Sequence, residues 1–114
     1  MDDKLSQLRE VAAEAATGEL SGWETKMVML QGIADGILSR DNRKRSGGEI
    51  MAKKLTAYYM RQEGYSYPAI ARLFKQKTHV TARKHALDCE FFLDIKDKSY
   101  CLANRMAKEM GIWS

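Results

Sequence analysis

Apolar residues recur at intervals of three and four along most of the chain, which is the spacing of one face of an α-helix. This periodicity predicts an all-α protein, a small bundle of about six helices. Breaks in the pattern and changes in charge put the predicted helices at residues 3–17, 21–39, 49–62, 66–74, 78–95 and 99–110.

Local signals mark several of the predicted helix ends. We expect Gly18 to end the first helix, and Ser21 with Glu24 forms a capping-box pattern that starts the second. Gly64 and Gly111 follow apolar helical stretches. They are expected to end those helices, because glycine tolerates the left-handed conformation common after a helix C-terminus.

The same positions predict the core. On the helix at residues 49–62, four side chains are expected to face inward (Ile50, Met51, Leu55 and Tyr58). Ala82 and Ala86 are small enough to let their helix approach the preceding one closely. Trp113 is expected to fold back onto an apolar surface.

The chain divides into three predicted segments. Residues 1–39 form an N-terminal helical hairpin with a net charge of −4, residues 40–48 a basic linker, and residues 49–114 the remaining domain. The two stripes of the hairpin cannot bury each other well, so they pack on the rest of the chain or form a surface for a second copy or a partner protein. Two glycines and a run of charges argue against a regular helix in the linker.

Residues 64–87 predict two short helices separated by a tight basic turn. Ser66 is a good N-cap for the first, and Pro68 in the first turn removes no N–H that the helix needs. Thr78 can cap the second, which begins with short polar side chains rather than acids. This is the helix-turn-helix plan, in which the second helix enters the DNA major groove. An ordinary helical hairpin with a solvated basic face is the alternative.

A resemblance to a known family strengthens the DNA-binding interpretation. The segment Ser66-Tyr67-Pro68-Ala69-Ile70-Ala71-Arg72-Leu73-Phe74, followed after three residues by Thr78-His79-Val80-Thr81, resembles the C-terminal DNA-binding domain of the bacterial replication initiator DnaA. That domain is a Trp-repressor-like helix-turn-helix with the pattern Ser-Leu-Pro-x-Ile-Gly-x-x-Phe, a Gly-containing basic turn and Asp-His-Thr-Thr-Val. The match runs without a gap over residues 66–82 and extends to about residues 43–110, and it implies binding of double-stranded DNA.

The sequence departs from the family at three places. Thr78 replaces the usual Asp, Val80 replaces the first Thr, and Lys75 with Gln76 replaces the glycine of the turn. The resemblance therefore implies a different target sequence and a changed docking angle. Nothing in residues 1–48 matches the family's ATPase module, so only the DNA-binding part is implied.

The distribution of charge agrees with a polyanion partner. The net charge is only +4, but residues 40–85 contain twelve Lys or Arg against three acids. Such asymmetry is typical of a polyanion-binding module attached to neutral or acidic scaffolding.

The groove hypothesis assigns roles to individual residues. Those expected to contact base edges lie at the start of the second helix (Thr78, His79, Val80 and Arg83). Those expected to contact phosphates surround them (Arg72, Lys75, Lys77, Thr81 and Lys84). Three linker residues are expected to reach phosphates or the minor groove (Arg43, Lys44 and Arg45).

No catalytic set is evident, so we expect neither an enzyme nor a cofactor or metal. His79 and His85 are six residues apart and do not share a face as an i, i+4 metal pair would. Cys89 and Cys101 are expected to be reduced core residues. No apolar run reaches the ~20 residues of a membrane helix, and the acidic N-terminus lacks a signal-peptide core. We therefore expect a cytoplasmic, nucleoid-associated protein.

Together these patterns predict a non-enzymatic, sequence-selective, double-stranded DNA-binding protein in a replication or mobile-element context. The rival hypotheses are a transcriptional regulator, a helical adaptor that binds an acidic protein through its basic face, and an RNA-binding protein.

Overall fold

The computed structural model describes residues 18–40 and 46–113 of the chain. Within those residues the fold is all-helical, as predicted, and no strand is present. The five helices are α2 (Gly18–Arg40), α3 (Ser46–Gln62), α4 (Tyr67–Leu73), α5 (Val80–Asp94) and α6 (Lys98–Glu109). The helix predicted at residues 3–17 lies outside the described residues, so the predicted N-terminal hairpin is described only in its second helix.

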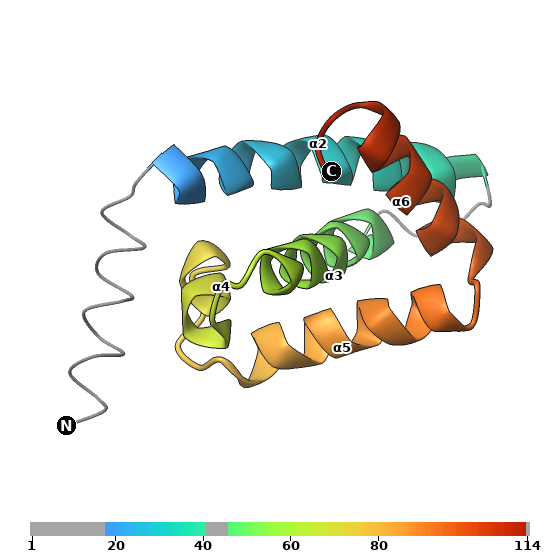
Figure 1. Ribbon diagram of the computed structural model, residues 1–114. Helices are drawn as coiled ribbons and strands as arrows, with labels where there is room; N and C mark the ends of the chain where they lie inside the picture. Colours follow the sequence, from blue (N-terminus) through green and yellow to red (C-terminus); the bar gives the residue numbers. More distant parts are fainter. Residues whose placement is uncertain (1–17, 41–45, 114) are drawn as a thin grey trace, which may run out of the picture.

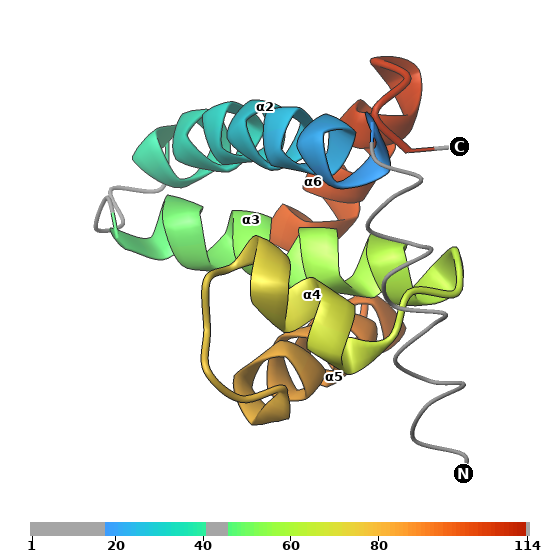
Figure 2. The same cartoon turned by 90° about the vertical axis from the view of Figure 1, so that its left-hand side faces the viewer.

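Helix α3 is the centre of the arrangement. It lies between α2 and α5, while α4 lies at one end of the molecule and α6 leads from the end of α5 back toward α2 (Figure 1). The view turned by 90° keeps α3 between α2 and α5 and shows α4 beside both α3 and α5 (Figure 2). A helix with neighbours on several sides must be apolar around most of its surface.

The burial of α3 follows from that position. Four of its apolar side chains are almost completely buried (Ala52, Leu55, Ala57 and Met60). Thr56 is buried as well, and its hydroxyl donates a 2.7 Å hydrogen bond to the carbonyl of Ala52, so burial leaves no unpaired donor. Of the four residues predicted to face inward, Met51 and Leu55 do so, Tyr58 is half-buried and Ile50 is exposed.

Tyr59, rather than Tyr58, is the buried tyrosine of α3. Its ring stacks on Trp113 with the centroids 4.6 Å apart, and its hydroxyl donates a 2.8 Å hydrogen bond to Oδ1 of Asn104. Burial raises the pKa of Tyr59 above its ordinary value. Trp113 thus folds back onto the core as predicted, and α3, α6 and the C-terminal residues are joined at one point.

Helix α2 packs within the chain. Its inner face contributes Trp23, Leu30, Ala34 and Ile37 to the same apolar core as α3, α5 and α6. Gly32 and Gly36 lie on the opposite side, where an added Cβ would meet nothing within 4 Å. For residues 22–38, therefore, packing on the rest of the chain is the alternative that the structure supports.

The ends of α2 and α3 differ from the predicted boundaries. Helix α2 already begins at Gly18, so Ser21 lies inside it rather than capping it. Helix α3 begins at Ser46, so residues 46–48, which we assigned to the linker at residues 40–48, are helical. A Cβ added to Gly48 would lie 1.8 Å from Oδ1 of Asp35. The glycines taken as helix breakers are therefore places where α3 approaches α2 closely.

Helices α3, α4, α5 and α6 end in the same way. The residue after each C-cap has a positive φ: 98° at Gly64, 56° at Lys75, 58° at Lys96 and 75° at Gly111. At each end the amide of this positive-φ residue and the amide of the residue after it donate hydrogen bonds to carbonyls of the last turn, which is the pattern of a Schellman motif. The stops predicted at Gly64 and Gly111 are confirmed, whereas the two lysines occupy a conformation that glycine adopts more easily.

Candidate nucleic-acid interface

Helices α4 and α5 form the region in which the sequence predicted a helix-turn-helix. Ser66 caps α4 as predicted, because its hydroxyl accepts a 3.3 Å hydrogen bond from the amide of Ala69. Ala82 and Ala86 are both buried, so small side chains lie on the inner face of α5. The connection spans residues 74–79 and is longer than the tight turn that we predicted.

The connection leaves α4 through Lys75 in the left-handed conformation. Its amide donates to the carbonyl of Arg72 at 3.0 Å, and the amide of Gln76 donates to the carbonyl of Ala71 at 2.9 Å. These bonds satisfy the last carbonyls of α4 and fix the direction in which the chain leaves the helix. The side chains of Lys75 and Lys77 are exposed as a consequence.

Helix α5 begins at Val80, with His79 as its N-cap, and this corrects the prediction that Thr78 caps it. The amide of Arg83 donates to the carbonyl of His79 at 2.9 Å, while the His79 side chain makes no capping hydrogen bond. Thr78 therefore lies one residue outside the cap. The first amides of α5 have no side-chain cap, and its first turn carries no acid.

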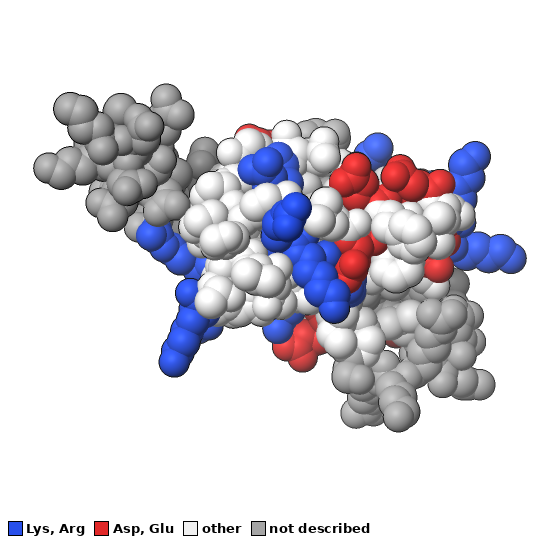
Figure 3. Space-filling model, turned by 90° about the horizontal axis from the view of Figure 1, so that it is seen from below, with Lys and Arg blue, Asp and Glu red and all other residues white. Residues whose placement is uncertain are grey.

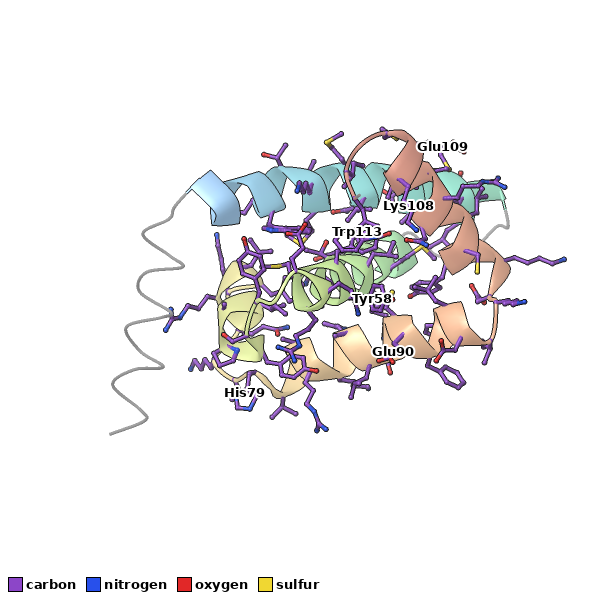
Figure 4. The ribbon with its side chains drawn as sticks, in the orientation of Figure 1. Tyr58, His79, Glu90, Lys108, Glu109 and Trp113 are labelled. Atoms are coloured by element: carbon purple, nitrogen blue, oxygen red, sulfur yellow. The ribbon has the colours of Figure 1, made fainter. Side chains whose placement is uncertain are left out.

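The four residues predicted to contact bases are all exposed and lie together at this end of α5. Val80 is the most apolar of them and is 66% exposed, while Thr78, His79 and Arg83 are also on the surface. His79 points away from the body of the molecule (Figure 4). None of the four is required for packing in the core.

The residues predicted to contact phosphates divide into two groups. Four cations are exposed on α4, the connection and the first turns of α5 (Arg72, Lys75, Lys77 and Lys84). Thr81 is half-buried beside them. The three linker cations lie outside the described residues (Arg43, Lys44, Arg45).

Three other cations counted in the basic stretch take part in contacts within the chain. Lys53 pairs with Glu49 at 3.3 Å, and Lys54 forms a partly buried ion pair with Asp88 of α5. Arg61 lies over the ring of Tyr67, with its guanidinium carbon 4.5 Å from the ring centroid. The sequence carried a signal for the first of these contacts, the i, i+4 spacing of Glu49 and Lys53, but none for the contacts of Lys54 and Arg61.

The charges of α5 are segregated along its length. Arg83 and Lys84 are exposed in its N-terminal half, whereas Glu90 and Asp94 are exposed in its C-terminal half. Figure 3 shows this face: Lys and Arg lie over α4 and the start of α5, carboxylates lie beyond them, and further Lys or Arg side chains project at the far edge. Cations near a helix N-terminus and anions near its C-terminus interact unfavourably with the helix dipole, at about 0.3–1 kcal/mol for a charge in the terminal turn. Helix stability therefore does not account for this order.

His85 of α5 is the titratable group that the sequence gave no reason to single out. It is half-buried, its ring meets that of Phe74 edge-on with the centroids 6.0 Å apart, and its Nδ1 is buried without a hydrogen-bond partner. Burial, followed by the charges of Lys54 and Lys53, lowers its pKa below the ordinary value for histidine. It is a packing residue behind the exposed face rather than part of that face.

Comparison with known proteins gives no relative: no protein-family model, no curated protein and no solved structure matches the chain. Among residues 18–40 and 46–113, no three His, Cys, Asp or Glu side chains are grouped closely enough to hold a metal ion. Nor does any helix in the described part of the chain have the length and apolar character needed to cross a membrane.

Proposed function

We propose that the chain is a non-enzymatic, sequence-selective double-stranded DNA-binding protein that inserts the N-terminal end of α5 into the major groove. The observation that carries this proposal is the composition of that end: exposed polar side chains, an N-terminus without a side-chain cap, and exposed cations on both sides. Helix N-termini bind phosphate through their amides and dipole. The likeness of residues 66–82 to the DnaA DNA-binding domain points the same way.

Base contacts come from the cap and the first turn of α5. His79 can donate a hydrogen bond to a base acceptor, and the methyl groups of Val80 can contact the methyl group of thymine. Arg83, one turn further on, is long enough to contact a guanine edge or a phosphate. These three chemistries favour a mixed site rather than the initiator's own, since Val80 stands where the family has a threonine.

Phosphate contacts set the register. Lys77 and Lys84 lie on either side of His79 along the chain, and Lys75 and Arg72 extend the basic surface toward α4. Glu90 and Asp94 are repelled by the same phosphates. The N-terminal half of α5 therefore approaches the duplex while the C-terminal half stays away from it.

Salt dependence tests the proposal most directly. If about six phosphates are neutralised, log K falls with log salt at a slope near −5, from ~0.9 per contact. We expect this from fluorescence anisotropy of a labelled duplex selected from a random pool, and the selected sequence itself identifies the target. A slope near zero contradicts the groove model. Tighter binding of single-stranded RNA than of duplex DNA favours the RNA-binding hypothesis. Tighter binding of an acidic protein, without displacement of duplex DNA, favours the adaptor hypothesis.

Three variants separate base from phosphate contacts. His79→Ala is expected to lose ~1–3 kcal/mol on the selected site and much less on random duplex. Lys84→Ala is expected to weaken both equally and to reduce the salt slope by about 1. Lys108→Ala is the control, because this exposed lysine of α6 lies on a different side of the molecule from His79 (Figure 4). An equal loss on both duplexes for His79→Ala would remove its assigned role.

A further inference from the structure

A second feature of α5 includes Val80 but extends well beyond the proposed DNA contacts. Four apolar side chains are exposed along it: Val80 (66%), Leu87 (43%), Phe91 (58%) and, at its C-cap, Ile95 (56%). At 3.6 residues per turn, the first three lie within about 40° of one another around the helix, and Ile95 lies close beside them. Together they form an outward stripe, which we call the α5 stripe.

The α5 stripe rests on packed side chains. The ring of Phe91 meets that of Phe92 with the centroids 5.8 Å apart, and Phe92 stacks on Tyr100 at 4.6 Å. Tyr100 is buried between α5 and the rest of the core. The stripe is therefore part of a firmly packed helix and has a fixed shape. Contiguous exposed apolar surface of this kind marks an interaction site more often than isolated apolar residues do.

The charges beside the stripe define what fits on it. Arg83 lies on one flank of its first half, and Glu90 and Asp94 lie on the same flank of its second half, while Lys84 lies within the stripe between Val80 and Leu87. Reversing the direction of the helix exchanges the two signs. The face is consequently complementary to a copy of itself laid antiparallel, in both its apolar centre and its charged ends.

We propose that two copies of the chain associate through the α5 stripe, with their α5 helices antiparallel about a two-fold axis at the level of residue 89. In this register Leu87 lies opposite Phe91 of the second copy, and Arg83 lies on the same flank as Asp94 of the second copy. Each contact occurs twice because the interface is isologous, so the assembly closes at two copies. The pairing also supplies partners for cations and carboxylates whose order disfavours the isolated helix.

The dimer is independent of the proposed function. It requires no nucleic acid, and it would stand if the chain bound none. The two uses nevertheless share Arg83 and Lys84, so a copy paired through α5 cannot present these residues to DNA.

Sedimentation equilibrium of the full chain, without nucleic acid, measures the association. We expect a monomer–dimer equilibrium that Phe91→Ser weakens by at least ~10-fold, since a central aromatic carries a large share of an interface. Val28→Ser is the matched control: Val28 is 69% exposed on α2, far from the stripe in the sequence, and its loss is expected to leave the equilibrium unchanged. Circular dichroism confirms that each variant keeps its helices.

Charge reversal tests the register. Arg83→Glu and Asp94→Lys are each expected to weaken self-association by ~10-fold or more, because each places like charges opposite one another at both symmetric positions. An equimolar mixture of the two variants restores both attractive pairs and is expected to dimerise as the unmodified chain does. A chain that stays monomeric to millimolar concentration overturns the proposal, whatever covers the stripe. A dimer whose self-association Phe91→Ser leaves unchanged also overturns the proposal. So does an equimolar mixture of the two charge-reversal variants that associates no more strongly than either variant alone.

Discussion

Helices α3 and α5 are similar in length, yet their side chains have different roles. Nearly every side chain of α3 between Met51 and Met60 is buried or paired within the chain. Helix α5 buries one narrow face, with Ala82, Ala86 and Cys89, and exposes apolar residues and adversely ordered charges on the other. Packing explains the composition of α3. The outer face of α5 has a composition that packing does not explain, and such a face is where contacts with other molecules are to be sought.

The largest expected effect comes from truncating matched leucines on the two helices. Leu55 of α3 is completely buried, whereas Leu87 of α5 is partly exposed. Leu55→Ala is expected to lower the free energy of unfolding by about 2–5 kcal/mol through lost burial and a cavity. Leu87→Ala should cost well under that. Urea denaturation followed by circular dichroism measures both, and equal losses would remove the distinction between the helices.

A capping variant is expected to separate stability from binding at the start of α5. His79→Asp supplies the side-chain cap that the native residue lacks and adds a negative charge where the helix dipole favours one. We expect the free energy of unfolding to rise by ~1 kcal/mol while affinity for the selected duplex falls. His79→Asn is the control, since it caps without the charge. A stabilised variant with undiminished affinity would mean that this end of α5 does not meet phosphate.

The C-terminal ends of the two helices allow a smaller test. Gly64 after α3 and Lys96 after α5 both have positive φ. Lys96→Gly is expected to stabilise the protein by roughly 0.5–1 kcal/mol, because it relieves the strain of a side chain in the left-handed region. Gly64→Ala should destabilise it by about as much. Thermal unfolding distinguishes the two signs, and Lys96→Ala separates the conformational effect from loss of the charge.

The smallest expected effect is a dependence of stability on pH through His85. Its pKa is lowered in the folded protein by burial and by Lys54, Lys53 and Lys84, against an opposing contribution from Asp88. The unfolded chain therefore binds this proton more readily. Stability is complete above the unfolded pKa of about 6.5 and declines as pH falls through that value toward the folded pKa. His85→Phe is expected to flatten the curve between pH 7 and pH 5, and an unchanged slope would assign the dependence to other groups.

Local signals predicted the parts of the fold that local interactions decide. The cap at Ser66, the stops at Gly64 and Gly111 and the burial of Cys89, whose pKa burial raises to about 12, are confirmed. The predictions were wrong where contacts with a segment distant in the sequence determine the local structure. Gly48 lies in helix α3, and its lack of a Cβ leaves room for Asp35 of α2, a contact that nothing in the sequence indicates.

The candidate site was predictable to a similar extent. The cap, the polar first turn and the nearby cations placed Thr78 to Lys84 at one end of a helix, and all of these residues are exposed except the half-buried Thr81 and the buried Ala82. Contact with DNA stays a prediction. The ion pair of Lys54 could not be predicted, because Asp88 meets Lys54 only after α3 and α5 pack, whereas the i, i+4 spacing of Glu49 and Lys53 is a signal in the sequence for the other pair. The α5 stripe was also missed, since periodicity does not distinguish an inner apolar face from an outer one.

The order of charge along α5 has a consequence that acts before any contact is made. A helix with cations at its start and carboxylates toward its end adds side-chain charge to the backbone dipole, so the two reinforce each other. The electric field of an approaching polyanion exerts a torque on this helix, and during diffusion it turns the basic end of the helix toward the polyanion. At 0.1 M salt this torque fades beyond about 10 Å. Low ionic strength should therefore raise the association rate constant far more than it lowers the dissociation rate constant.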